Sequence, residues 1–479
     1  MRILRVLTAA ALLGAFPIAA SAATFTVDTT TLDAGDIAPG DGECAWATFP
    51  PVGQRCTLRA AIMEANALPG ADRVIVPFGA TIVLDNAGRD EDAGALGDLD
   101  ITGPLEIQTT SLSDPASSPT IDANGIDRVF DVHYSAIEVH LVNLRITGGA
   151  ADDATTFLGG GVRSQVPLLH LWFCDIVGNA ANGGGGLFLM HSLDMVGSDV
   201  HGNVVTDLGF TNVDGSAIRD SDSGAEPGNT ISIRASTIRA NLALGGPGTH
   251  AAVIVRTPLV VENSTFSGNL PNALHVYGAD ATLTHATITG SQNGYSFGGP
   301  TLQSDSVVRN TVIAGNTVAD CVFFASHATS HAYTLDGDGS CQLTFGVGNL
   351  PGADARLRPL AVRFGRVAVH DLGAGSEAID AADPLLQGAG GHLPRQRPGR
   401  DRSPARRRRR WRTLRHGRDR IPGPDLRRRV RTAATLSRFA GRARACTRPA
   451  QQVCCAARKA GSCVRRGVRV VEGARLESV

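Results

Sequence analysis

Short apolar segments recur along the chain in a fixed frame of small and polar residues. From about residue 100, small or polar residues precede an apolar residue, and a Gly-Asn or similar pair follows it. The copies are LRITGGA at 144–150, FCDIVGN at 173–179, GSDVHGN at 197–203, ASTIRAN at 235–241, NSTFSGN at 263–269, HATITGS at 285–291 and NTVIAGN at 310–316. Their central apolar residues are Ile146, Ile176, Val200, Ile238, Phe266, Ile288 and Ile313, spaced by 30, 24, 38, 28, 22 and 25 residues. A period in the twenties, made of short strands and turns, indicates a solenoid.

An all-β fold, the right-handed parallel β-helix, accounts for this pattern. Leucine-rich repeats have a similar period, but their repeated leucine frame is absent here. Few helix-length apolar periodicities separate the strands, which disfavours βαβ units. A β-sandwich, whose surface turns are independent of one another, has no reason to repeat the same sequence pattern seven times, so it is also disfavoured. In a β-helix the apolar residues of successive coils stack and bury a continuous column.

The asparagine that ends most units is expected at a turn between strands. Asparagine tolerates left-handed backbone, and its side-chain amide can bond the asparagine of the next coil. The expected ladder consists of Asn179, Asn203, Asn241, Asn269 and Asn316. The uneven spacing of the units implies insertions that form loops on one face, the longest at 204–230.

The exposed end of a solenoid has to be covered, and the segment RCTLRAAIMEANA at 55–67 predicts a capping helix. Leu58, Ala61, Ile62 and Ala65 lie on one apolar stripe, at i, i+3, i+4 and i+7. Thr57 precedes the stripe and can serve as the N-cap. We therefore expect a short helix that leads into the first coil.

The first twenty-two residues are typical of a secretory signal peptide. Arg2 and Arg5 precede a short apolar run, and Ala20-Ser21-Ala22 supplies a small-residue cleavage site. The run is too short for a stable membrane anchor. We expect cleavage after Ala22 and a monomeric protein that is secreted or displayed at the cell surface or outer membrane.

The cysteines agree with an oxidising compartment. Two pairs are close in sequence and are predicted disulfides, Cys44–Cys56 and Cys321–Cys341. Cys174 is left over within a strand-like segment and is expected to be a buried apolar residue. No CxxC pair occurs in residues 1–390, so zinc ligation by cysteine is not expected there.

Motifs near both ends of the body resemble those of bacterial surface proteins. The segment CTLRAAI at 56–62, followed by Asn66, is similar to the CSLREA-domain motif, with Ala60 in place of the usual acidic residue. The segments TLDGDGSC at 334–341, GNLPGADARLRPLA at 348–361 and GSEAIDAADP at 375–384 resemble the choice-of-anchor Q module, with Glu377 in place of the usual proline. The repeats between them resemble right-handed parallel β-helix proteins of bacterial surfaces. The resemblance implies a cap with the first coils over 23–100, β-helix repeats over 101–330 and an anchor-like region over 331–390.

A balanced total charge hides two dissimilar parts of the chain. Of 45 basic and 45 acidic residues, 391–479 contain 27 basic and 5 acidic, so 1–390 contain 18 basic and 40 acidic. The acidic body would repel phosphates, which excludes nucleic acid as its partner. The choice-of-anchor Q module normally continues with a DQRG-like and then a CDIGA-like stretch, and neither is present here. If the codons of the tail are read in a shifted frame, they are compatible with both stretches in that order. We infer a frame slip near residues 385–393; the competing interpretation is a genuine, unstructured Arg-rich arm for polyanions.

Candidate chemistry is confined to two acidic segments. The insertion at 204–230 contains Asp207, Asp214, Arg219, Asp220 and Asp222. A polysaccharide lyase would need a base beside a carboxylate-bound Ca²⁺, and a hydrolase would need two carboxylates at a set separation. A solvated acidic loop explains the same residues. Asp336 and Asp338 alternate with glycines and could hold Ca²⁺, although a tight turn before Cys341 also explains them.

These features together predict a secreted or cell-surface β-helix protein that displays its surface for binding, in the manner of an adhesin. The expected ligand is a polysaccharide or a host or cell-surface molecule, and no cofactor is expected apart from a weak case for Ca²⁺. An enzyme that cleaves polysaccharide in the β-helix groove is the first alternative. A structural envelope protein is the second.

Overall fold

The computed structural model describes residues 21–383, apart from residue 90 and nine short segments. These segments are 112–116, 152–157, 207–213, 222–226, 245–249, 299–303, 325–326, 344–345 and 365–366. Most of the expected signal peptide and the whole Arg-rich tail therefore lie outside the described residues. All described residues belong to one compact unit.

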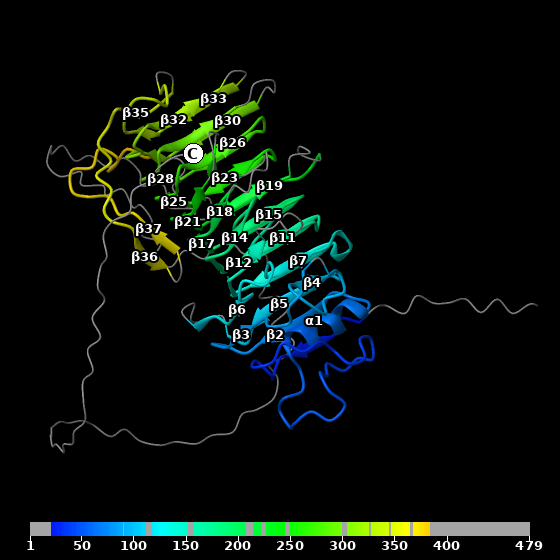
Figure 1. Cartoon of the computed structure of the whole chain (residues 1–479). Coiled ribbons are helices and arrows are strands. Elements are labelled where there is room, and N and C mark those ends of the chain that lie inside the picture. Colours follow the sequence, from blue (N-terminus) through cyan, green and yellow to red (C-terminus); the bar gives the residue numbers. More distant parts are fainter. Residues whose placement is uncertain are drawn as a thin grey trace, which may run out of the picture. The chain divides into compact units, whose positions relative to one another are not determined.

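The described chain is a right-handed parallel β-helix in which each full coil adds one strand to each of three long sheets (Figure 1). Sheet 1 consists of β1 (Thr24–Thr26), β2 (Asp72–Val76), β5 (Leu105–Thr109), β8 (Glu138–Val142), β12 (Leu168–Trp172), β16 (Ser192–Val196), β20 (Ile231–Arg234), β24 (Leu259–Glu262), β27 (Ala281–Thr284), β30 (Ser304–Arg309) and β33 (His327–Ala332). Sheet 2 consists of β3 (Thr81–Val83), β6 (Thr120–Asp122), β9 (Arg145–Thr147), β13 (Asp175–Val177), β17 (Asp199–His201), β21 (Thr237–Arg239), β25 (Thr265–Ser267), β28 (Thr287–Thr289), β31 (Val312–Ile313), β34 (Leu335–Asp336) and β35 (Leu350–Pro351).

Sheet 3 completes the coils. It consists of β4 (Leu99–Ile101), β7 (Phe130–Val132), β11 (Val162–Ser164), β15 (Leu187–Leu189), β19 (Ile218–Asp220), β23 (Ala251–Val255), β26 (Asn272–Val276), β29 (Asn293–Phe297) and β32 (Ala319–Phe323). A short fourth sheet lies between sheets 2 and 3 in chain order and consists of β10 (Ala150–Ala151), β14 (Ala180–Ala181), β18 (Val204–Thr206) and β22 (Leu242–Leu244). The coils extend beyond residue 330, through β33 and β34 to β35.

The predicted apolar repeat positions form one continuous column inside sheet 2. Register pairing places Ile146 next to Ile176 and Ile176 next to Val200, and the same register continues to Ile313. All seven side chains are fully buried. Because side chains alternate across a strand, the residues on either side of each apolar position face away from the core. The solenoid prediction is confirmed.

Two hydrogen-bonded ladders run along the coils beside this column. In the first, the side-chain amide of Asn179 donates to Asn203 Oδ1 at 3.0 Å, and the pattern repeats from Asn203 to Asn241 and from Asn241 to Asn269. The second ladder was not predicted. In it, the backbone N–H of Cys174 donates to the hydroxyl of Ser198, and Ser198 N–H donates to the hydroxyl of Ser236.

The asparagine ladder differs from the expectation in two respects. Left-handed backbone falls on the residue before each asparagine, for example Gly178 (φ 67°) and Gly202 (φ 62°), because glycine adopts that conformation without a Cβ clash. Asn316 does not extend the asparagine series, because Ser291 occupies the intervening coil. Oδ1 of Asn316 accepts a hydrogen bond from the backbone N–H of Ser291, and the side-chain amide of Asn316 donates to Asp320 at 2.8 Å.

Helix α1 (Leu58–Ala67) covers the N-terminal end of the solenoid, as its apolar stripe predicts (Figure 1). Thr57 accepts a hydrogen bond from Ala60 N–H at 3.0 Å and begins the helix as its N-cap. The helix also buries a charged residue. Arg59 is 1% exposed, and its guanidinium binds Asp33 at 2.6 Å and three backbone carbonyl groups.

The C-terminal part of the described chain folds back along sheet 2. The antiparallel pair β36 (Ala361–Phe364) and β37 (Val367–Val369) lies beside it, and the hydroxyl of Thr237 exchanges two hydrogen bonds with the backbone of Ala368 (Figure 1). Both predicted disulfides, Cys44–Cys56 and Cys321–Cys341, are present, and Cys174 is buried. Among the residues that the structure describes, no helix has the length and apolar character needed to cross a membrane.

Candidate functional site

The described carboxylates of the predicted acidic insertion each bind other parts of the chain. Asp207 and Asp222 lie outside the described part of the chain. Asp214 faces His250, at 2.8 Å. Arg219 and Asp220 are buried on strand β19 rather than exposed in a loop, because this segment pairs with β15 and β23 as a regular part of sheet 3.

Asp220 has a structural role in that strand. One carboxylate oxygen accepts the backbone N–H groups of Arg256 and Thr257, both at 2.7 Å, and so holds the turn that follows β23. Burial raises the pKa of Asp220 to about 6, although these two donors oppose the shift. Asp220 is 1% exposed and holds this turn, which differs from the exposed loop carboxylate that the sequence predicts.

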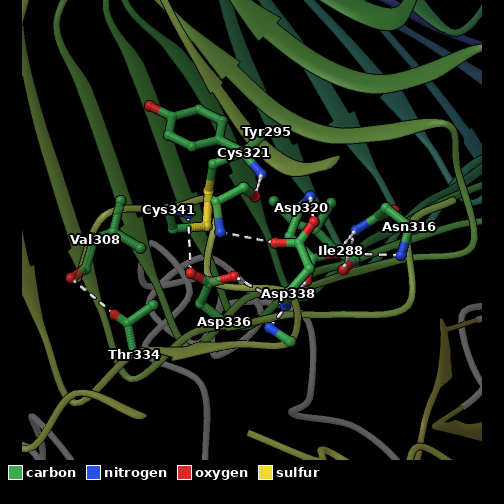
Figure 2. Close-up of a disulfide and its surroundings, with 12 residues drawn as sticks. Ile288, Tyr295, Val308, Asn316, Asp320, Cys321, Thr334, Asp336, Asp338 and Cys341 are labelled. Atoms are coloured by element: carbon green, nitrogen blue, oxygen red, sulfur yellow. Dashed lines mark hydrogen bonds between the residues drawn. A yellow bond between two sulfur atoms is a disulfide. The ribbon is translucent and has the colours of Figure 1, made fainter. Parts of the chain in front are cut away.

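The predicted pair Asp336 and Asp338 lies beside a third carboxylate in the structure. Asp320, from β32, lies with Asp336 and Asp338 beside the Cys321–Cys341 disulfide (Figure 2), and one oxygen of each carboxylate lies within 4.8 Å of the others. Backbone N–H groups occupy these carboxylates: Asp336 accepts from Gly339 and Cys341, and Asp320 from Gly337. Burial raises the pKa of Asp336 to about 6.

Hard oxygen ligands of this kind suit Ca²⁺. The same hydrogen bonds, however, close the turn before Cys341 without an ion. Asp336 also ends the buried column of sheet 2, since it pairs with Ile313 one coil below. A hydrogen-bonded turn at the end of the solenoid therefore explains the geometry of this acidic cluster.

A row of polar side chains on the outward face of sheet 1 is the strongest candidate for a functional surface. In consecutive strands, register pairing aligns Arg73, Glu106, His140, His170 and Asp194. Inward residues alternate with them and are fully buried. Each strand of the row therefore places a charged or ionisable side chain about 4.8 Å from the next one.

The centre of this row is a connected network. His170 lies between two carboxylates, with Nε2 at 3.0 Å from Glu138 Oε1 and Nδ1 at 3.2 Å from Asp194 Oδ2. The Trp172 indole N–H donates to the same Asp194 oxygen at 3.3 Å. Arg234, from β20, forms an ion pair with the other oxygen of Asp194.

Protonation in the network follows from these contacts. Burial alone would raise the pKa of Asp194, but hydrogen bonds from His170 and Arg234 outweigh it and lower the pKa to about 2. Burial, with the neighbouring His170 ring, lowers the pKa of His140. Near neutral pH the network therefore contains an ionised Asp194 and a neutral His140.

Aromatic surface adjoins this network. The rings of His140 and His170 stack at 4.1 Å, and the Trp172 ring meets both of them edge-on at 5.1 and 5.0 Å. Trp172 is half-buried, and the next residue, Phe173, is 44% exposed. We call Glu138, His140, His170, Trp172, Asp194 and Arg234 the sheet 1 network.

The repeat frame also contains a signal for this network, at a fixed distance from the apolar positions. The residues that lie six positions before each central apolar residue are His140, His170, Asp194, Ser232, Val260, Thr282 and Val307. Register pairing shows that they form one outward column. Chemistry-bearing residues cluster at its first three positions, and an alignment of the units on the apolar residue would have revealed them.

A third polar cluster lies near the N-terminal end of sheet 3 and is structural. Asp98 and Asp131 are buried and share Arg128, with Nη1 contacts of 2.8 and 3.2 Å. Burial raises the pKa of Asp98 well above its usual range. Because Arg128 and Arg163 already neutralise these carboxylates, little capacity remains for a ligand.

Comparison with known proteins adds little to these observations. No family model matches the chain, and no curated protein is significantly similar to it. One solved structure, the crystal structure of pectate lyase Pel9A, aligns with 76% of this chain and 93% of its own, at 11% sequence identity and a TM-score of 0.35.

Proposed function

We propose that this protein is an exported, surface-displayed β-helix that binds polysaccharide through the sheet 1 network, at strands β8 to β20 of the outward face of sheet 1. The contiguous sheet 1 network carries the proposal. Solenoid faces are extended and present one residue per coil at regular intervals, which suits a linear polymer. The signal-peptide-like N-terminus supports export, where extracellular glycans are accessible.

The orientation of Trp172 supports a carbohydrate ligand. Its indole N–H is held by Asp194 and its ring edge meets two imidazoles, so the half-buried ring has a fixed position. An aromatic ring binds the apolar C–H face of a sugar, while adjacent charged groups accept or donate hydrogen bonds to its hydroxyls. Exposed Phe173 extends the aromatic surface at the neighbouring corner.

The charges of the face favour a ligand rich in hydroxyl groups over a strong polyanion. Glu106, Glu138 and Asp194 contribute carboxylates, whereas Arg73 and Arg234 contribute guanidinium groups. Arg73 pairs with Glu106 at 2.9 Å, and Arg234 pairs with Asp194. Because both of these cations are paired, a polyanion would gain little net attraction at the network; exposed Arg309 lies outside it, three strands beyond Arg234.

Cleavage of the bound polysaccharide by a lyase or hydrolase is the second candidate, and one observation favours it. His170 is hydrogen-bonded to two carboxylates from different coils, at 3.0 and 3.2 Å. Such an imidazole can take up or deliver a proton at a reacting group. Binding without turnover needs only the exposed surface, so it is the simpler function.

Affinity electrophoresis of the full chain against neutral and acidic polysaccharides, run in parallel with chelator and with added Ca²⁺, tests both candidates. Trp172→Ala should weaken the retention by about two- to tenfold, since an aromatic contact contributes roughly 0.5–1.5 kcal/mol. Thr282→Ala is the matched control, because Thr282 lies in the same outward column four strands beyond His170. Equal retention of both variants would refute the proposed surface, and new reducing or unsaturated ends would show cleavage.

A further inference from the structure

Three potential metal ligands converge at the edge of the sheet 1 network. Nε2 of His140 lies 3.2 Å from Glu138 Oε1, and Nε2 of His170 lies 3.0 Å from the same oxygen. One ligand atom from each of the three residues lies within 4.8 Å of the other two. We propose that Glu138, His140 and His170 form a binding site for a divalent transition-metal ion, with Zn²⁺ as the best match.

The backbone explains why the two imidazoles lie side by side. His140 and His170 are register partners on the adjacent parallel strands β8 and β12. Their rings are parallel to within 10° and stack at 4.1 Å, so equivalent nitrogens face the same direction. Glu138 lies two residues before His140 on the same face of β8, and its carboxylate closes the set.

The spacing matches a common metal centre. Zinc–nitrogen and zinc–oxygen bonds of about 2.0–2.1 Å at a tetrahedral angle place neighbouring ligand atoms about 3.3 Å apart. The two nitrogen–oxygen separations here are 3.2 and 3.0 Å. Rotation of the two rings out of their stack, about their own side-chain bonds, would bring both Nε2 lone pairs onto one ion beside the Glu138 carboxylate.

Asp194 supplies the supporting contact that metal-binding histidines usually have. Its Oδ2 lies 3.2 Å from His170 Nδ1 and is itself held by the Trp172 indole N–H. When an ion replaces the proton on Nε2, Nδ1 keeps its hydrogen bond to Asp194, and the Nε2 lone pair, on the side of Glu138, binds the ion. Asp194 is thus a positioning residue, which fixes the tautomer and the ring orientation of a ligand.

Ligand type and exposure define the class of ion. Two imidazoles with one carboxylate favour Zn²⁺ and similar transition metals over Ca²⁺ or Mg²⁺, which prefer oxygen ligands. The Glu138 and His140 side chains are 51% and 26% exposed, so an ion can reach the site from solvent. Three protein ligands also leave a fourth position open for water or a ligand hydroxyl, as in catalytic rather than structural zinc sites.

Isothermal titration of the full, metal-stripped chain with ZnCl₂ tests this site independently of glycan binding. The reduced tail contains four cysteines that can also take up zinc, so the readout is the difference between variants. The wild type should bind one more equivalent than His140→Ala/His170→Ala and Glu138→Gln. Glu138 is exposed, so Glu138→Gln should leave the fold intact, which circular dichroism checks.

Two further variants sharpen the test. Asp194→Asn keeps all three ligands and should weaken zinc binding by about 10–100-fold, the usual effect of losing such a support. His201→Ala is the matched control, because His201 is a half-buried histidine paired with Asp175 on sheet 2. Zinc uptake by the ligand variants equal to that of the wild type would overturn the proposal, whatever the result of the glycan assay.

Discussion

Replacing Asn203 with alanine should be among the most damaging single changes in the solenoid. Its side chain is fully buried and makes four hydrogen bonds: the amide donates to Ile176 O at 2.9 Å and Asn241 Oδ1 at 3.1 Å, and Oδ1 accepts two bonds from Asn179 at 3.0 Å. At about 1 kcal/mol net for each bond, Asn203→Ala should lower the free energy of unfolding by about 4 kcal/mol. Both adjacent coils lose a partner in this variant.

Guanidinium unfolding at equilibrium measures the total loss, and amide hydrogen exchange locates it, because repeat proteins can open locally. Exchange should accelerate first around β13, β17 and β21, the strands whose turns the ladder joins. Thr282→Ala, at an exposed strand position, should stay within about 0.5 kcal/mol of the wild type. A loss below about 1 kcal/mol for Asn203→Ala would refute the view that the ladder holds the coils in register.

Three further predictions concern buried polar groups. Arg59→Met should cost about 3–5 kcal/mol in the same unfolding assay, since it leaves the carboxylate of Asp33 buried without its cation; a loss under 1 kcal/mol would contradict this. Cys174→Ser should change stability by less than about 1 kcal/mol, because Ser198 occupies the equivalent position one coil on, and a larger loss would show that the thiol packs differently. The pKa of Asp220 is raised to about 6 in the fold against 3.8, so the folded state binds the proton more tightly, and stability falls by roughly 3 kcal/mol as the pH rises from about 4 to 6. Asp220→Asn should remove that part of the pH dependence of unfolding, and an unchanged profile would contradict the assignment.

The fold was predictable because its signal is periodic. Each coil repeats one apolar position, and the stacking of Ile176 on Ile146 requires only that equivalent positions meet. The capping helix was predictable for a similar reason, since Leu58 and Ile62 lie on one face of a short segment with a clear N-cap. Both disulfides were predictable because the two cysteines of each pair are close in sequence.

The candidate site was not predicted, because its residues carry no local motif. Glu138, His170 and Asp194 lie on three strands and meet only through the register of sheet 1. The sequence instead indicated the acidic insertion, because its charged residues are close together along the chain. In the fold, however, Asp220 of this insertion is a buried strand residue. The role of Arg59 was also missed, because a charged residue within a helix is usually solvated.

Titration calorimetry of the polysaccharide that the chain retains most strongly tests the central claim most directly. The proposal predicts saturable binding that weakens about two- to tenfold in Trp172→Ala and is unchanged in Thr282→Ala. Deuterium exchange of the same complex should show protection of β8, β12 and β16. Undiminished affinity in Trp172→Ala, with protection elsewhere on the coils, would contradict the assignment of binding to this face of sheet 1.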